Sequence, residues 1–407
     1  MTLLGTAMTA QENVLSDKVN IRYVAETRRD LRIDMLRGIA LVMMVVAHTE
    51  VLSILNVVTW ERFGLTTGAE GFVILSGFMI GYLKRRQLQT EPMLTVAYSL
   101  LRRAITLYIV NIVIIVSILI FSQFSFIDTF EITHFTDRFS DTSYSMFPVN
   151  EQVREAWFNE VIFLQIGPHQ TQILGLYFYL LLISPVVLWL LNEKRGGWLL
   201  LLSVVAYIFY QFSRVRVTSA EFEFAFPLLA WQLIFVMGMC CGWYKEEIFS
   251  LAKTQVGKGI LTGMVTFALV MMFVAQNHTN PFLPPEIMMH FIDPADFNWF
   301  YQTFAAKNEL GPLRIANDFC LIITMYLLLT RYWVPINRLL GWFLIVLGQN
   351  SLYVFIVHVY VILLVTQFFT FNLWEQRWVF NTLIHLSVLM TLWLMARYGV
   401  MRVIIPN

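Results

Sequence analysis

An ionisable cluster interrupts the first apolar segment of the chain. Asp34, Arg37 and His48 lie in RDLRIDMLRGIALVMMVVAHTEV, residues 29–51. At about 100° per residue on a helix, the three side chains point to one face. Glu50 follows about 200° round from His48 and is not expected to be its direct partner on this helix.

His48 has the side chain best suited to proton transfer. At about 1.5 Å per residue it lies about 16 Å beyond Arg37, near the bilayer midplane if Arg37 sits at the cytoplasmic boundary. Ionisable groups at that depth usually face a bundle interior or a water-filled cavity. A neutral imidazole can accept a proton from a hydroxyl and return it, whereas the structural alternative is an interhelical hydrogen bond.

The elements that must position these residues are membrane helices. The 407 residues are 58% hydrophobic and 14% charged, with a mean hydropathy of +0.65, whereas soluble domains are about 25% charged. The net charge of +1 gives no indication of a nucleic-acid partner. The three cysteines lie in apolar runs and indicate no disulfide framework, and the polar first residues lack a removable signal peptide.

The hydropathy pattern predicts an all-α, polytopic membrane protein with about ten transmembrane helices. Lys and Arg gather in alternate connections, so the positive-inside rule puts both termini in the cytoplasm. We expect a cytoplasmic segment 1–33, a single transmembrane domain 34–400 and a cytoplasmic tail 401–407. The predicted spans are near 36–56, 69–83, 104–123, 173–191, 198–212, 226–243, 259–275, 316–330, 341–366 and 378–396.

Two long polar segments, 124–172 and 276–315, fall on the predicted extracytoplasmic side. Connections of that length are uncommon unless they have a function or a structure of their own. They could form a cap that lines a site for a polar acceptor, or they could simply cover helix ends. His169, His290 and Asp293 lie in them among aromatic residues, which suits sugar binding but also marks membrane interfaces.

Several blocks of the sequence resemble a known group of membrane enzymes. Arg37, ten further residues and His48 look like the arginine-x10-histidine signature of the acyltransferase-3 superfamily, and GAEGFVILSGFMIGY at 68–82 is similar to its second-helix motif. Four blocks resemble the OpgC branch of membrane acyltransferases, which is named for succinylation of osmoregulated periplasmic glucans. They are RDLRIDMLRGIALVM, FGLTTGAEGFVILSG, PLLAWQLIFVMGMCCGW at 227–243 and LGQNSLYVFIVHVYV at 347–361.

The resemblance implies transfer of a succinyl or acetyl group from cytoplasmic acyl-CoA to a hydroxyl of an extracytoplasmic glycan or glycolipid, across a bacterial inner membrane. It implies that His48 is catalytic and that Arg37 lies toward the donor. The superfamily's arginine pair is not reproduced, since Thr106 follows Arg103 at that spacing. Besides membrane lipid, the possible partners include glycan-synthesis proteins or a second copy of the chain.

Basic residues on the predicted cytoplasmic side could bind the CoA phosphates. Arg86, Arg102 and Arg103 belong to the densest basic group, and guanidinium groups match the geometry of phosphate oxygens. The positive-inside rule alone would also place them there. No metal-ligand spacing is evident, so we expect no metal, and the resemblance implies acyl-CoA as the acyl donor.

Two acidic residues could assist catalysis. Glu70 could orient His48 or bind acceptor hydroxyls, whereas Thr67 three residues earlier predicts a capping box that begins a helix. Asp34 lies three residues before Arg37 and could fix its direction, or form an interfacial salt bridge with it.

Four further residues are candidates for substrate binding. His358 is expected about 25 Å along an outward-running span and hence near the outer surface, where a histidine without a function is equally plausible. The other three are Glu50, Asn350 and Ser76.

We predict that His48 is the general base for a glycan hydroxyl that attacks the thioester carbonyl. A covalent acyl-imidazole on His48 is the mechanistic alternative. In a rival class, a proton-coupled transporter or flippase of a glycan or lipid, His48 and Asp34 would form a proton relay. Such proteins often contain internal repeats, and none is evident. A catalytically silent subunit of a glycan-synthesis complex is the third possibility.

Overall fold

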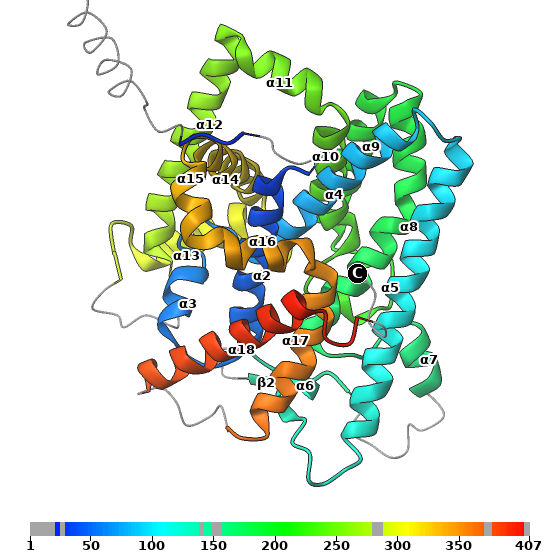
Figure 1. Cartoon of the computed structure of the whole chain (residues 1–407), viewed down its shortest axis with the longest axis vertical. Helices are drawn as coiled ribbons and strands as arrows, with labels where there is room; N and C mark the ends of the chain where they lie inside the picture. The colour runs from blue at the N-terminus through cyan, green and yellow to red at the C-terminus, as the bar shows by residue number, and fades with distance from the viewer. Residues whose placement is uncertain are drawn as a thin grey trace, which may run out of the picture.

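Long helices form the body of the protein, as the computed structural model shows (Figure 1). In the described part of the chain two short antiparallel strands, β1 (His134–Asp137) and β2 (Thr142–Ser145), make up the only sheet. They lie at the lower end of the bundle in Figure 1, and this architecture agrees with the predicted all-α class. The structure describes residues 21–24, 29–137, 142–147, 157–278, 288–369 and 377–402.

Each predicted apolar segment is helical over most of its length. The long helices are α2 (Leu31–His48), α4 (Gly68–Gln87), α5 (Met93–Phe121), α8 (Gln172–Asn192), α9 (Gly196–Ser213), α10 (Leu228–Trp243), α12 (Gln255–Val274), α14 (Pro312–Arg331), α17 (Ser351–Thr366) and α18 (Trp378–Tyr398). The short ones are α3 (Ile54–Thr59), α6 (Phe130–Thr133), α7 (Trp157–Ile162), α11 (Lys245–Lys253), α13 (Pro294–Phe300), α15 (Trp333–Ile336) and α16 (Trp342–Gln349). Single turns are η2 (His169–Thr171), η3 (Glu221–Phe224), η4 (Ala275–Asn277), η6 (Tyr301–Ala305) and η7 (Asn337–Gly341).

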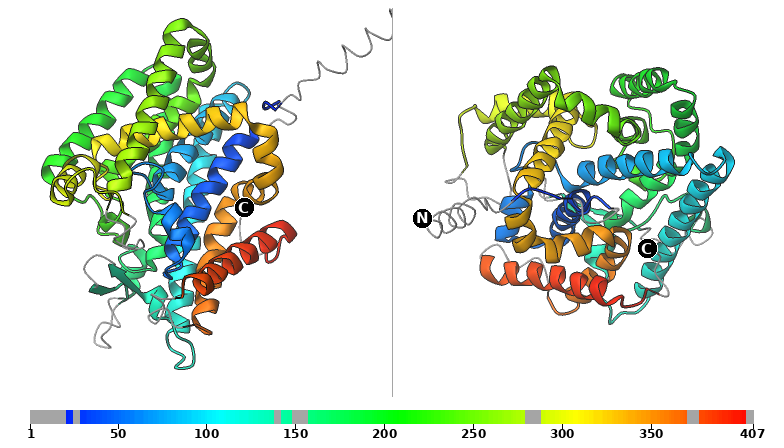
Figure 2. Two further views of the ribbon diagram at one scale, coloured as in Figure 1. Left: turned by 90° about the vertical axis from the view of Figure 1, so that its left-hand side faces the viewer. Right: turned by 45° about the horizontal axis from the view of Figure 1, so that its top comes forward.

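Six of the described helices are long and apolar enough to cross a membrane, and eight candidate spans result if each of two bent helix pairs counts as one. The chain from α15 to α16 meets α17 at a bend of 90°, and α10 meets α11 at 73°. These numbers are lower than the ten predicted spans, partly because α2 and α4 each contain at least three charged residues. Both of those helices lie inside the bundle, where other helices surround them (Figure 2).

Small residues allow α4 and α10 to pack closely. A Cβ atom on Gly77 would lie 2.3 Å from the Phe235 carbonyl oxygen, and one on Gly242 would lie 2.0 Å from the Phe78 carbonyl oxygen. Close backbone approach through small residues is the usual way in which membrane helices associate. This contact holds the middle of α4 against α10.

α2 ends at His48, although the predicted span continued to residue 56. His385 on α18 contacts the Thr49 carbonyl oxygen at 2.9 Å and the Ser53 hydroxyl at 2.7 Å, and so holds the turn that follows the helix. Ser53 in turn caps α3. Glu50 therefore lies in a turn and not on a continuing helix, so the helical angle that separated it from His48 does not apply.

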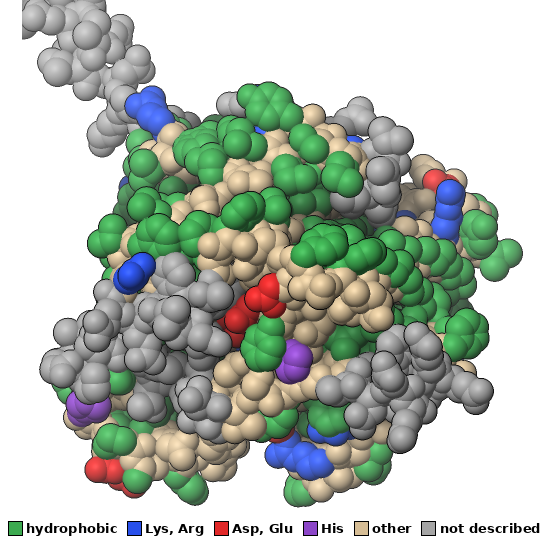
Figure 3. Space-filling view, turned by 90° about the horizontal axis from the view of Figure 1, so that it is seen from below, with side chains coloured by type: hydrophobic (Ala, Val, Ile, Leu, Met, Phe, Trp, Pro, Cys, Tyr) green, Lys and Arg blue, Asp and Glu red, His purple; other side chains and the backbone are tan. Residues whose placement is uncertain are grey.

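The lower end of the bundle has a polar centre. Figure 3 views the protein from this end and shows acidic and histidine side chains near the middle of the face, among apolar and uncharged surface. Lys and Arg side chains lie toward the rim in this view.

Candidate active site

Two histidines join the end of α2 to α17. The Nδ1 atom of His48 lies 2.9 Å from Nε2 of His358, and the two rings stack with their centroids 5.1 Å apart. Nδ1 of His358 contacts the carbonyl oxygen of Phe355. A carbonyl can only accept, so a neutral His358 carries its proton on Nδ1 and accepts the hydrogen bond of His48 Nδ1–H at Nε2. Nε2 of His48 is then left with a lone pair.

His358 does not lie on one straight span from 341, as the sequence predicted, but follows the bend between α16 and α17. The bend between α16 and α17 shortens the distance along the bundle, and His358 is 1% exposed. The bend therefore brings His358 to the level of His48.

A third histidine comes from η2. Nε2 of His169 lies 3.2 Å from Oε1 of Glu50, and the side chains of this pair are 8% and 9% exposed. The rings of His48 and His169 meet edge to face with their centroids 5.9 Å apart. Residues from α2, the turn after it, η2 and α17 thus form one polar cluster.

A cavity of about 70 Å³ lies beside His48, between the end of α2 and the first turns of α4 and α8. Its polar lining includes His169, Gln170 and Lys307. Lys307 is the only Lys or Arg among the described lining residues, and burial lowers the pKa of its ammonium group. The remaining lining residues are Met43, Met44, Ala47, Thr59, Trp60, Thr67, Gly68, Ala69, Ile173 and Phe226.

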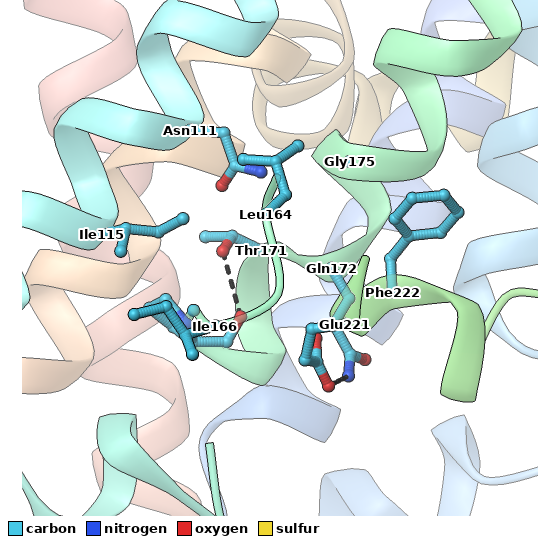
Figure 4. A pocket seen from close by; sticks show the side chains of 11 residues that line it. Asn111, Ile115, Leu164, Ile166, Thr171, Gln172, Gly175, Glu221 and Phe222 are labelled. Atoms are coloured by element: carbon cyan, nitrogen blue, oxygen red, sulfur yellow. Dashed lines mark hydrogen bonds between the residues drawn. The ribbon is translucent and has the colours of Figure 1, made fainter. Parts of the chain in front are cut away.

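The η2 turn that carries His169 is anchored on a second side. Figure 4 shows a smaller cavity of about 10 Å³, enough for roughly one water, where Gln172 pairs with Glu221 of η3 and the Thr171 hydroxyl donates to the Pro168 carbonyl. Burial raises the pKa of Glu221 to about 7, against the opposing effect of the hydrogen bond from Gln172. These contacts hold η2 between α5 and η3.

Glu70 belongs to a separate, buried ion cluster. Nη1 of Arg314 lies 2.8 Å from Glu70, and Nη2 lies 2.5 Å from Glu61. The predicted capping box is also present, since Glu70 accepts from the Thr67 backbone N–H at 3.0 Å. Burial opposes ionisation of Glu61, but the Arg314 guanidinium outweighs it and holds the pKa of Glu61 below its ordinary value. The cluster supports the first turn of α4, which lines the cavity.

Arg37 and Asp34 contact the bend between α16 and α17. Arg37 donates to the Ser351 hydroxyl, and its guanidinium lies 5.9 Å from the centre of the Phe72 ring. Asp34 accepts from the Gln349 amide at 3.3 Å. Nε of Arg37 is buried and has no hydrogen-bond partner among the described residues.

The other predicted donor-side residues are exposed at helix surfaces. Arg86 donates to the Tyr82 hydroxyl at 3.2 Å, while Arg102 and Arg103 lie exposed on α5. None of these three side chains lines the cavity beside His48 in the described structure.

Ser76 and Asn350 also lie outside the described cavity lining. Ser76 on α4 lies beside the Tyr177 hydroxyl. The Asn350 side chain lies at the helix bend and joins α16 to the chain after α18, because it donates to the Val346 carbonyl at 2.7 Å and accepts from Arg402 at 2.8 Å. No group of three or more His, Cys, Asp or Glu suited to a metal ion occurs in the described ranges.

The fold and this site define a class, a helical membrane protein with a histidine-lined cavity inside the bundle. Within that class, residues 29–402 match the family described as OpgC protein, and the chain belongs to this family. Neither a curated protein nor a solved structure matches the chain. Membership implies a membrane acyltransferase-like function in glucan modification.

Proposed function

We propose that the protein is an acyl-CoA-dependent membrane O-acyltransferase related to the acyltransferase-3 superfamily. It transfers an acyl group from cytoplasmic acyl-CoA to a hydroxyl of a periplasmic glycan or glycolipid, and it resides in a bacterial inner membrane. The observation that carries this proposal is the His48–His358 pair beside a cavity, together with membership of the OpgC family.

His48 acts as the general base. The acceptor O–H bond breaks as its proton moves to Nε2 of His48, and the oxygen forms a bond to the thioester carbon. The C–S bond then breaks, and the CoA thiolate takes the proton from the imidazolium. His358 is a positioning residue, because its hydrogen bond keeps Nε2 of His48 unprotonated and fixes the ring. An acyl group carried covalently on Nε2 is the alternative course for the same residues.

The first turn of α4 supplies a counterpart for the carbonyl oxygen. Gly68 and Ala69 line the cavity at positions where backbone N–H groups have no partner within the helix. Such groups, with the positive end of the helix dipole, stabilise the negative charge that develops on the oxygen during attack.

The donor approaches from the end of the bundle that carries the exposed arginines. Arg86, Arg102 and Arg103 would meet the CoA phosphates, and the unpartnered Nε of Arg37 would lie along the path of the thioester arm. Asp34, held by Gln349, supports the Arg37 side of this path.

Lys307 favours a succinyl group over an acetyl group. Its ammonium lines the cavity with His48, where Glu61 and Glu70 attract it, and no ion pair within 4.0 Å joins it to a described side chain. A terminal carboxylate on the acyl group could approach it more closely, whereas acetyl offers no second charge. The family resemblance leads to the same choice of acyl group.

The transporter alternative has one observation in its favour. The buried charges of Glu61, Glu70 and Arg314 resemble the ionisable clusters that serve proton-coupled transport. That reading predicts movement of a glycan or lipid without cleavage of a thioester.

Release of CoA thiol by the purified protein tests the proposal. With succinyl-CoA or acetyl-CoA and envelope glycans, the wild type should release thiol, and His48→Ala should lower the rate by at least about 100-fold. Glu193→Ala, which removes an exposed side chain at the end of α8, serves as the control and should retain the rate. Absence of thiol release from a folded wild type with either donor would instead favour a transporter or a non-catalytic subunit.

A further inference from the structure

The cavity beside His48 contains two buried polar atoms without partners. Nδ1 of His169 and Oε1 of Gln170 have no hydrogen-bond partner among the described residues. Both residues line the cavity, and Gln170 is only 1% exposed. Since buried polar atoms in folded proteins nearly always have a partner, a ligand or ordered water is expected at these two atoms.

Both atoms are hydrogen-bond acceptors. The Glu50 carboxylate faces Nε2 of His169 and can only accept, so a neutral His169 carries its proton on Nε2 and has a lone pair on Nδ1. The Gln170 amide nitrogen donates to the Glu131 carbonyl at 3.0 Å, which fixes the direction of the amide and leaves its oxygen as the group without a partner among the described residues. The missing partners are therefore hydrogen-bond donors.

The need for hydrogen-bond donors distinguishes the sugar from acyl-CoA. The thioester carbonyl, the acyl carboxylate and the phosphates of acyl-CoA offer acceptors, which two lone pairs would repel. Sugar hydroxyls offer O–H donors, and one sugar unit carries several of them. These two atoms therefore suit the sugar that receives the acyl group and not the thioester end of acyl-CoA.

We propose that His169 and Gln170 form the acceptor subsite and accept hydrogen bonds from two hydroxyl groups of one sugar unit beside His48. Glu50 is a positioning residue, because it holds the proton of His169 on the nitrogen that faces away from the sugar. In the free protein water occupies the subsite and the sugar displaces it. This inference rests on the proposed transfer to a glycan hydroxyl.

The distances in the cavity also place the two substrates relative to each other. His169 meets His48 edge to face, so a hydroxyl bound near Nδ1 of His169 belongs to the same sugar unit as a hydroxyl that reaches Nε2 of His48. Lys307 lines the same cavity and remains available to an anionic group of the acyl chain. The cavity would therefore hold the acceptor unit and the acyl end side by side.

Steady-state kinetics of Gln170→Leu and Glu50→Gln test the subsite. Both variants should raise the acceptor KM about fivefold or more and leave the succinyl-CoA KM within about twofold. Gln165→Leu is the matched control, since Gln165 contacts Ser219 and does not line the described cavity. A fall in kcat alone, or an equal rise in both KM values, would overturn the proposal.

A monodeoxy sugar gives a second readout that a merely structural role would not move. Removal of the hydroxyl that Gln170 binds should weaken acceptor binding by the wild type about as much as Gln170→Leu does. The same removal should weaken acceptor binding by the Gln170→Leu variant little further. Full additivity of the two changes at every hydroxyl position would contradict the assigned contact. Thermal unfolding in detergent identifies any variant that fails to fold, in which case Gln170→Met is used in its place.

A direct binding measurement separates this inference from the proposed function. If the wild type transfers no acyl group, titration with a β-linked glucose tetrasaccharide still tests the subsite. Binding that is lost in Gln170→Leu and kept in Gln165→Leu would support it. No binding to the folded wild type would overturn it.

Discussion

The hydrogen bonds from Phe355 through His358 to His48 give each imidazole a different task. The Phe355 carbonyl fixes the proton of His358, and His358 fixes the proton of His48. Only the last nitrogen of the series, Nε2 of His48, is left to react. This assignment follows from partners alone and needs no carboxylate next to His48.

Replacement of His358 tests this order. His358→Leu removes the acceptor for His48 Nδ1–H, and we expect kcat to fall by about 10- to 100-fold while the acceptor KM stays within about twofold. His358→Gln offers an amide oxygen to the same hydrogen bond and should restore part of the rate. Thiol-release kinetics measure both variants. A raised acceptor KM with unchanged kcat would return His358 to the substrate-binding role expected from its sequence position.

Substitution of Lys307 tests whether this residue recognises the succinyl group. Lys307→Met keeps the length of the side chain and removes its charge, so the rate with succinyl-CoA should fall about tenfold relative to the rate with butyryl-CoA. Butyryl has the same number of carbons and no terminal carboxylate. Lys307→Arg should keep the preference for succinyl. An equal loss with both donors would show that Lys307 does not recognise the acyl group.

At the scale of elements, two breaks in predicted continuous spans form the site. The sequence predicted single helices at 36–56 and 341–366, because apolar runs show length but not bends. The structure ends α2 at His48 and bends the second segment by 90° before α17. The first break frees Glu50 to reach His169, and the second brings His358 to His48.

Other features follow directly from local sequence. The capping box at Thr67 and Glu70 has a signature within four residues, and the structure confirms it. The partners of Glu70 could not be found in this way. Arg314 lies 244 residues further along the chain, so only the packing of α14 against the start of α4 brings it to Glu70.

The anchor of η2 should make stability depend on pH through Glu221. Burial raises the pKa of Glu221 to about 7, whereas the ordinary Glu value is about 4.3. The protonated form therefore contributes its full stability below about pH 4.3, and this contribution is lost as the pH rises through about 7. Glu221→Gln, which stays neutral, should therefore unfold a few degrees above the wild type at pH 8 and close to it at pH 5.

Thermal unfolding in detergent at the two pH values measures this difference. Glu193→Gln, which removes an exposed carboxylate at the end of α8, is the control and should show no such dependence. A Glu221→Gln midpoint that follows the wild type at both pH values would contradict the buried, proton-linked anchor.

At the scale of the whole molecule, the proposed transfer would bring the two substrates to the cavity from different ends. α2 begins at the end of the bundle opposite β1 and β2 (Figures 1 and 2), so Arg37 near its start and Glu50 after its end lie toward opposite ends. Charged α2 and α4 are enclosed by more apolar helices, which removes their ionisable groups from lipid. This arrangement suits transfer across a membrane without movement of either whole substrate through it.

Transfer of a labelled succinyl group in proteoliposomes tests the central claim most directly. Labelled succinyl-CoA is supplied on the arginine-rich side and a glucan on the other, with the wild type beside His48→Ala and the surface control Glu193→Ala. The wild type and Glu193→Ala should place label on the glucan, and His48→Ala should not. No label on the glucan with folded wild type, or equal labelling by His48→Ala, would contradict acyl transfer by this histidine.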